Sequence, residues 1–342
     1  MARLSLSVCL SRNPMTEPIL TGQVSPEGIN WIPSSVHPSE MFWRQLRYAD
    51  FDVSEMSLSS LSLAVSRGMH DWIAIPVFTT RRFFHTGIIV RSGAGIEHAG
   101  DLAGKRVGVP EYQQTAAVWA RGALAHEFGV SPDQMRWFME RRPERSHGGA
   151  TGFVPPPGVT LDYIDPGSSI GAMLERGELD AALVYLSGRN LVDRTPRGAA
   201  ELGGVRPLFA DPVAEGQRYY ARTGILPVNH VVVIRAGLLE QHPWVALNVF
   251  SAFVAAKRAV FGSLAALEGE IGTGGGLIEP WLQIGAIERS ALTRLTEVDP
   301  LPYGLAAQGA VLDTLADYLV EQHLVSRRLN VPELFAVSTR QL

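Results

Sequence analysis

The stretch KRVGVPEYQQTAAVWARGAL, residues 105–124, runs from a short apolar strand into a helix. The strand covers residues 106–109, and the apolar pattern from residue 115 onward predicts the helix. Between them, residues 111–115 place an acid, an aromatic residue, two amides and a hydroxyl at the helix start. Backbone amides are unpaired there, and the helix dipole attracts anions. The turn therefore predicts contact with a ligand.

The same alternation of strand and helix patterns extends over most of the chain. Strand-like segments include residues 3–10, 29–33, 72–78, 135–140, 179–186 and 229–235. The run 72–78 is continuously apolar, which is typical of a strand covered on both faces. Strand–helix alternation predicts two mostly parallel α/β sheets, and such sheets bind ligands at the carboxyl ends of their strands. We therefore expect a ligand cleft between two lobes.

Composition excludes several classes of protein. The chain has 342 residues, a net charge of -4 and a single cysteine, Cys9. The mildly acidic net charge does not favour binding to nucleic acid or to an anionic membrane. A single cysteine cannot form an internal disulfide. The N-terminus lacks the long apolar block of a secretory signal, and we expect no membrane-spanning run. The sequence thus predicts a cytoplasmic protein, and leaves homo-oligomerisation open.

Common cofactor motifs are missing from the sequence. It contains no Walker A loop, no G-x-G-x-x-G at a strand–helix turn and no H-E-x-x-H. The nine histidines show no metal-ligand spacing. We therefore expect no cofactor and no metal, although a fold that gathers His85, Glu111 and His230 would offer a metal three ligands.

Five segments carry a resemblance to a known family. They are DLAGKRVGVPEYQQTAAVWARG (101–122), YYARTGILPVNHVVVIR (219–235), HPWVALNVFSAFVAAK (242–257), LPYGLAA (301–307) and RRLNVPELFA (327–336). In these segments the chain resembles the 4,5-dihydroxyphthalate decarboxylase family, enzymes with the two-lobed fold of type 2 periplasmic binding proteins. The resemblance implies a first lobe made of residues 1–92 and 207–342 and a second lobe made of residues 93–206. The loop 141–157 has no match in the resemblance.

The resemblance implies a carboxy-lyase that acts on a hydroxylated aromatic di-acid. Such an enzyme protonates the ring carbon that bears the carboxylate, and CO2 leaves as aromaticity returns. The expected partner is a small aromatic carboxylate. A non-catalytic solute-binding protein for an aromatic acid is the alternative reading of the same fold. A transporter receptor must be exported, so the missing export signal favours the enzyme.

The segment TTRRFFH, residues 79–85, follows the apolar strand and supplies cations. Adjacent side chains of an extended segment point to opposite sides, so only one arginine can face the cleft. We choose Arg82 as a carboxylate clamp, because alternation then places Phe84 on the same side. His85 is a candidate proton donor. The alternative is a pair of solvated arginines beside a core aromatic pair and an edge histidine.

The turn 111–115 supplies the expected anion site. Glu111 would be repelled by a carboxylate unless it were protonated, which makes it a candidate general acid. The amide of Gln114 and the hydroxyl of Thr115 suit a carboxylate ligand at this helix start, and we count Tyr112 with them as a substrate contact. An ordinary first-turn acid and a capping threonine are the simpler interpretation.

Three further candidates lie at other strand ends. Ser57 and Ser59 follow a second strand and could bond substrate oxygens, although Ser57 also fits a helix cap. Arg189 follows the strand at 179–186 and could close on a carboxylate, or it could be a surface arginine. His230 begins an apolar strand, where a histidine is usually a hydrogen-bonded core residue. Within the resemblance it is a third catalytic candidate, orienting a phenol.

Overall fold

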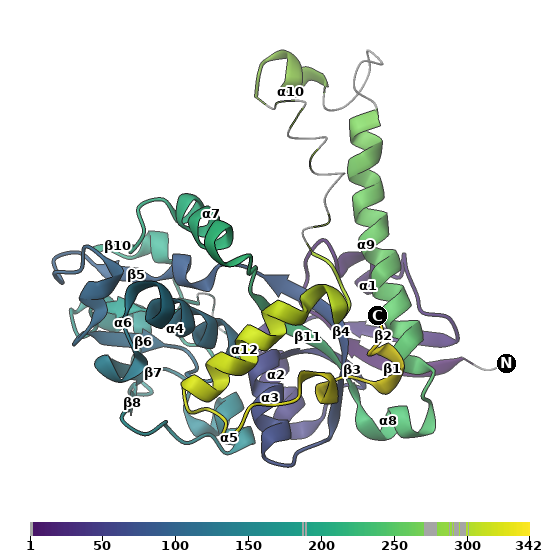
Figure 1. Cartoon of the computed structure of the whole chain (residues 1–342), viewed down its shortest axis with the longest axis horizontal. Helices are drawn as coiled ribbons and strands as arrows, with labels where there is room; N and C mark the ends of the chain where they lie inside the picture. Colours follow the sequence, from purple (N-terminus) through teal and green to yellow (C-terminus); the bar gives the residue numbers. More distant parts are fainter. Residues whose placement is uncertain are drawn as a thin grey trace.

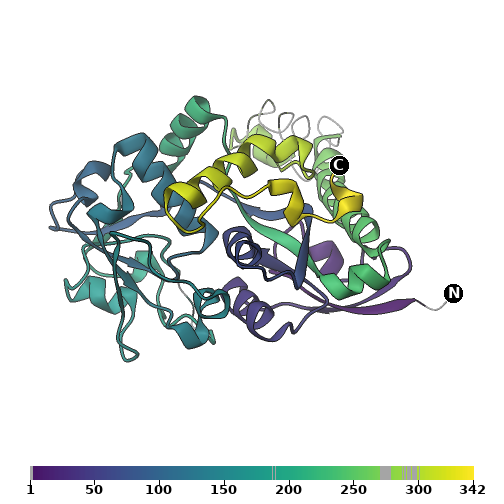
Figure 2. The same ribbon diagram turned by 60° about the horizontal axis from the view of Figure 1, so that its bottom comes forward.

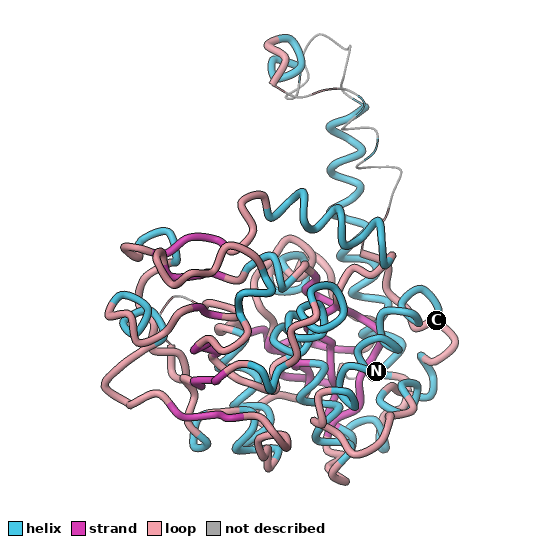
Figure 3. The backbone as a smooth tube through the Cα atoms, turned by 60° about the vertical axis from the view of Figure 1, so that its left-hand side comes forward, coloured by secondary structure: helices cyan, strands magenta, loops and turns pink. Residues whose placement is uncertain are grey.

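The computed structural model describes residues 3–186, 188, 190–269, 279–286, 288, 290, 294, 299 and 301–342. Figure 1 shows two α/β lobes side by side, each built around its own sheet. Figure 2, which turns the molecule, shows the same two bodies with the N-terminus at the far end of the first lobe. In Figure 3 the strands of each lobe lie inside a layer of helices and loops.

The first lobe contains a five-stranded sheet. Its order is β2 (Ile29–Ser34), β1 (Leu4–Cys9), β3 (Val53–Ser57), β11 (Val228–Arg235) and β4 (Trp72–Arg81). β1 pairs in parallel with β2 and β3, whereas β11 is antiparallel to both of its neighbours. The apolar run of β4 is buried as expected, because its central apolar residues Ala74, Ile75, Val77 and Phe78 are at most 2% exposed.

The second lobe contains a six-stranded sheet. Its order is β10 (Val205–Pro207), β5 (Ile89–Arg91), β9 (Ala181–Ala182), β6 (Arg106–Val109), β7 (Arg136–Met139) and β8 (Thr160–Tyr163). The pairs formed by β6, β7, β8 and β9 are parallel, and β5 is antiparallel to β9 and β10. Both sheets are therefore mixed, with more antiparallel pairing than expected. The antiparallel strands are the two that follow a crossing, because β5 enters the second lobe from the first and β11 returns to the first lobe from the second.

The chain crosses between the lobes twice, once after β4 and once after β10. β5 pairs within the second sheet. The first crossing therefore ends before residue 89 rather than at the expected residue 92. β10 ends at Pro207, and β11 rejoins the first sheet at Val228.

Helices cover both sheets. They are α1 (Glu17–Leu20), α2 (Pro38–Tyr48), α3 (Leu58–Ser66), α4 (Thr115–Phe128), α5 (His147–Thr151), α6 (Ile170–Glu175), α7 (Pro212–Thr223), α8 (Ala236–Gln241), α9 (Val245–Gly269), α10 (Glu279–Gln283) and α12 (Gly309–Glu321). α5 comes from the second lobe but packs on α2 and α3 of the first. This contact places residues of the expected loop 141–157 between the lobes.

The long helix α9 corrects one expectation of the sequence analysis. Its residues 245–266 are long and apolar enough to cross a membrane by length and composition alone. Its first turns are a core helix of the first lobe, because Val245, Val249 and Phe253 are fully buried against the sheet. Figure 1 shows the remaining turns extending away from both lobes.

Candidate functional site

A cavity of about 220 Å³ lies between the lobes, where strands of both sheets end. This volume suits a ligand of about one substituted ring. Its apolar wall includes Phe42, Phe84, Val184 and Leu186. Its polar wall is made by His37, Ser39, Ser57, Thr80, Arg82, Gln114, Arg141, His147, Tyr185, Asn229 and His230. The cavity thus combines an apolar surface for a ring with two arginines and three imidazoles.

The two strand-to-helix turns hold each other across the lobe boundary. The Ser57 and Thr115 hydroxyls lie 2.8 Å apart, and the Ser59 amide donates to Thr115 Oγ1 at 2.9 Å. The Ser59 hydroxyl donates to the carbonyl of Gln113 at 2.5 Å. Ser59 and Thr115 therefore join the lobes and do not line the cavity, whereas Ser57 does.

Arg141 is fully buried and lines the cavity. Its Nε donates to Asp193 Oδ1 at 2.7 Å and its Nη2 to Ser39 Oγ at 2.6 Å. Its Nη1 makes no hydrogen bond within the described residues and lies 3.8 Å from Glu111 Oε2. Burial alone would raise the pKa of Asp193, but Arg141 lowers it to about 2. The guanidinium is thus held by Asp193, Ser39 and the ion pair with Glu111, while its Nη1 still makes no hydrogen bond.

Gln114 offers a second donor to the same cavity. Its side chain is 7% exposed, and its Nε2 has no hydrogen-bond partner within the described part of the chain. Leaving a buried amide unpaired costs about 1–3 kcal/mol. An acceptor on a ligand would remove that cost.

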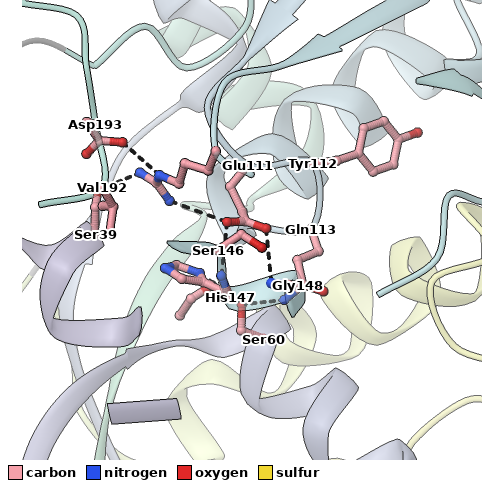
Figure 4. A network of polar contacts seen from close by, with 12 residues as sticks. Ser39, Ser60, Glu111, Tyr112, Gln113, Ser146, His147, Gly148, Val192 and Asp193 are labelled. Carbon is pink, nitrogen blue, oxygen red and sulfur yellow. Dashed lines mark hydrogen bonds and ion pairs between the residues drawn. The ribbon is translucent and has the colours of Figure 1, made fainter. Parts of the chain in front are cut away.

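Glu111 lies behind Arg141 and does not line the cavity, contrary to the sequence-based prediction. Its carboxylate accepts hydrogen bonds from the amides of His147 at 3.1 Å and Gly148 at 3.2 Å (Figure 4). Burial raises the pKa of Glu111 to about 7, against the opposing effect of Arg141. Glu111 therefore anchors the start of α5, which carries His147 into the cavity wall.

Tyr112 also lies outside the cavity, with its side chain pointing away from the Glu111 network (Figure 4). Its ring lies under the Arg121 guanidinium, 3.8 Å from Cζ, and packs edge-on against Trp137. Tyr112 is a core residue of the second lobe, because it follows Glu111 and faces the opposite side of the turn.

His230 is held by a buried glutamate. Its Nδ1 lies 2.8 Å from Glu55 Oε2 and 3.1 Å from Thr80 Oγ1, and its ring packs edge-on against Phe42. Glu55 Oε1 also accepts from the amide and hydroxyl of Ser11. Burial alone would raise the pKa of Glu55, but its bonds to His230 and Ser11 lower it. An ionised carboxylate accepts only, so Nδ1 carries a proton and Nε2 is left for a ligand.

His147 is the second buried imidazole of the cavity. Its Nδ1 lies 3.3 Å from the Ser60 hydroxyl, and its ring packs edge-on against Phe42, 5.6 Å between centroids. Burial, helped by Arg141, lowers the pKa of His147 to about 3. His147 is therefore neutral at neutral pH and suits hydrogen bonding rather than proton donation.

The segment after β4 divides its residues between two sides. Arg82 and Phe84 both line the cavity. His85 does not, because its Nε2 lies 3.1 Å from Glu215 Oε1 of α7 and its ring packs against Tyr219 and Phe209. Burial lowers the pKa of His85. Residues Phe84–Gly87 form a 3-10 turn, and His85 lies on the side opposite Phe84, which corresponds to the edge histidine of the alternative interpretation.

Two predictions remain, one about Arg189 as a carboxylate contact and one about a metal site. Arg189 lies outside the described residues. His85, Glu111 and His230 each have separate partners, and no group of three His, Cys, Asp or Glu side chains suited to a metal occurs in the described part of the chain.

Sequence reasoning missed Glu55, Arg141 and His147. Arg141 follows the carboxyl end of β7 by two residues, the position at which parallel sheets bind ligands. Glu55 is a charged residue within a strand that is buried throughout, and a buried charge requires a partner. His147 carried no comparable signal, because its position depends on how α5 packs across the lobes.

The chain is similar over nearly its whole length to a characterised enzyme. It is 33% identical over 338 residues to 4,5-dihydroxyphthalate decarboxylase of Comamonas testosteroni, an alignment that covers 98% of this chain and 97% of the relative. It is 36% identical over 209 residues to the enzyme of the same name from Pseudomonas putida, covering 58% of this chain and 81% of that protein. No family model matches the sequence.

Solved structures confirm the two-lobed fold. The aliphatic sulphonate binding protein SsuA of Escherichia coli superposes with a TM-score of 0.53 at 13% identity, over 98% of this chain and 92% of that one. SsuA of Xanthomonas axonopodis, bound to MOPS, gives 0.51 at 13% identity over 98% of this chain and 99% of that one. A mutant of the desulfurization enzyme DSZB, in complex with biphenyl-2-sulfinic acid, gives 0.50 at 16% identity over 99% of this chain and 98% of that one. At these identities the likeness concerns the fold alone.

Proposed function

Because the chain belongs to the 4,5-dihydroxyphthalate decarboxylase family, a family of carboxy-lyases, we propose that its substrate is 4,5-dihydroxyphthalate or a close analogue. This substrate is a single ring with two adjacent carboxylates and two adjacent hydroxyls. The observation that carries the proposal is one small cavity whose wall contains the buried Arg141 guanidinium, the Gln114 amide and the open nitrogen of the His230–Glu55 pair.

Arg141 and Gln114 bind one substrate carboxylate. Arg141 Nη1 and Gln114 Nε2 are buried nitrogens without a hydrogen bond within the described residues, Nη1 being ion-paired with Glu111 at 3.8 Å, and both residues line the cavity. Arg82 supplies a second cation at the same cavity. Phthalates carry two negative charges at neutral pH, so two guanidinium groups match the charge of the substrate.

His230 exchanges protons with the substrate. The ionised Glu55 fixes the proton on Nδ1 and leaves Nε2 to accept a proton from the phenol para to the departing carboxylate. The imidazolium that forms is stabilised by Glu55. Phe42 packs edge-on against both His230 and His147, which keeps the two rings in place.

The reaction consumes one proton. Ionisation of the phenol pushes electron density to the para carbon, which takes up a proton from solvent and loses aromaticity. The bond to the carboxylate carbon then breaks, its electron pair returns to the ring, and CO2 leaves. The phenolate that results takes back the proton held by His230. The apolar wall, including Phe84 and Leu186, favours the loss of CO2 because a poorly solvated carboxylate loses CO2 more readily.

The direct test is incubation of the purified protein with 4,5-dihydroxyphthalate. We expect equal amounts of CO2 and 3,4-dihydroxybenzoate, and release at least about 100-fold slower from His230→Gln protein that still binds phthalate. Tight binding of several hydroxybenzoates without CO2 release would contradict the proposal. It would support a solute-binding protein instead.

A further inference from the structure

A second and larger hollow lies on the other side of Arg82. It has a volume of about 850 Å³ and lies between α7, the end of β4 and the start of α12. We call it the α7 groove and define it by Arg81, Arg82, Phe83, Val213, Tyr220 and Val311. Arg82 also lines the cavity between the lobes, so one guanidinium borders both hollows.

α7 turns an apolar stripe toward this groove. Val213, Gly216 and Tyr220 recur at helical spacing and line it, together with the polar Gln217. Val213 is 69% exposed and Tyr220 52% exposed. The helix approaches so closely that a Cβ at Gly216 would lie 2.7 Å from Phe83 Cδ2. The groove therefore has a floor and a wall suited to a flat apolar ligand.

The groove carries unbalanced positive charge. Arg82 forms no ion pair with any described residue, and Arg81 Nε is buried without a hydrogen-bond partner in the described part of the chain. Burial lowers the pKa of Arg81 to about 10, as expected of a cation lacking a full counter-charge. Asp299 is the one carboxylate among the described lining residues, and it pairs with Lys257 Nζ at 2.6 Å.

We propose that the α7 groove binds a second molecule of aromatic carboxylate, with its ring on Phe83 and Tyr220 and its carboxylate on Arg81 and Arg82. The choice of an aromatic acid as the ligand rests on the function proposed above. The positive charge and the apolar walls of the groove are features of the structure and do not depend on that function. A carboxylate held there draws Arg82 away from the cavity between the lobes. Occupancy of the groove therefore weakens substrate binding, and the two sites are negatively coupled.

Phthalate, which lacks the hydroxyls that the reaction needs, is the probe. Val213→Glu places a negative charge in the groove at an exposed position outside the proposed catalytic machinery. Val337→Glu makes the same change at a residue that is 75% exposed and is not part of the groove lining. Equilibrium dialysis counts bound phthalate, and initial rates over a wide range of 4,5-dihydroxyphthalate concentration measure inhibition by excess substrate.

We expect two bound phthalates per chain in the unsubstituted and Val337→Glu proteins and one in Val213→Glu. Inhibition by excess substrate should weaken at least 10-fold in Val213→Glu, whereas Val337→Glu should keep the inhibition and the kcat/KM of the unsubstituted protein within twofold. Equal stoichiometry in the two variants would overturn the proposal. So would a Val213→Glu protein that keeps both phthalates but halves its mass in sedimentation, because the groove would then pack against a second copy. If no CO2 is released by any protein, the stoichiometry still tests the groove separately from the proposed function.

Discussion

Glu55 Oε2 lies 2.8 Å from His230 Nδ1, although the two residues are 175 positions apart in the sequence. The contact exists because β3 and β11 are antiparallel neighbours, with His230 opposite Ser57. Glu55 and Ser57 lie on the same face of β3, since side chains alternate along a strand. The buried Glu55 carboxylate therefore contacts Nδ1 of the His230 imidazole, while the same imidazole lines the cavity.

Glu55→Gln should lower kcat at least about 100-fold and leave KM within about threefold. A neutral amide no longer fixes the His230 tautomer or stabilises its protonated form, whereas the carboxylate contacts remain. Steady-state kinetics with 4,5-dihydroxyphthalate measure both constants.

Asp52→Asn is the matched control for Glu55→Gln. Asp52 accepts from the amide and hydroxyl of Ser7 as Glu55 does from Ser11, but it contacts no histidine among the described residues. We expect full kcat in this variant. Equal losses of kcat in both variants would mean that the carboxylates act only through the fold.

Gln114→Leu should have opposite effects on binding and on stability. Removing an unpaired buried amide raises the free energy of unfolding by about 1 kcal/mol. Losing a donor to a carboxylate raises KM about 10-fold, which corresponds to about 1.4 kcal/mol. Urea unfolding and steady-state kinetics test both effects. Loss of stability together with activity would contradict the assignment of Gln114 as a free donor.

Glu111 should make stability depend on pH. Its pKa is about 7 in the folded protein and 4.5 in the reference state, so the unfolded chain ionises first as pH rises. Its contribution is fully present below pH 4.5 and is lost as pH rises through 7. The Glu111→Gln protein lacks this loss. Relative to unsubstituted protein, its free energy of unfolding should rise by about 2 kcal/mol from pH 5 to pH 8.

Urea unfolding at the two pH values measures this difference. Glu333→Gln, at an exposed glutamate, is the control and should show no such change. A constant difference between Glu111→Gln and unsubstituted protein would show that Glu111 is ionised throughout this range.

His85→Gln should retain kcat within twofold and lower the free energy of unfolding by about 1–2 kcal/mol. The side chain bonds Glu215 and packs among aromatic rings outside the cavity. Thermal unfolding and activity of the same preparation test this. A 100-fold loss of kcat at unchanged stability would return His85 to the reaction.

Local patterns were sufficient for the lobes and for part of the site. The alternation of side chains along an extended strand predicted that Arg82 and Phe84 share a side, and both residues line the cavity. The same alternation gives His85 the opposite side, where it contacts Glu215 outside the cavity. The suggestion that His85 is a proton donor relied only on the pKa range of an imidazole.

Contacts across the lobes could not be derived from the sequence. Thr115 bonds Ser57, 58 positions away, and is thereby withdrawn from the ligand. Glu111 turns toward the amides of α5, a helix whose docking on the first lobe no local pattern indicates. The strand ends were therefore predictable, whereas the partner of each side chain was not.

The central claim is that His230, held by Glu55, carries the proton chemistry of a decarboxylation in the cavity between the lobes. Its most direct test is release of labelled CO2 from carboxyl-labelled 4,5-dihydroxyphthalate by unsubstituted and His230→Gln proteins, with phthalate binding measured on the same samples. The account predicts release by the unsubstituted protein, and for His230→Gln retained binding with release at least about 100-fold slower. Undiminished release by His230→Gln, or none by the unsubstituted protein, would contradict it.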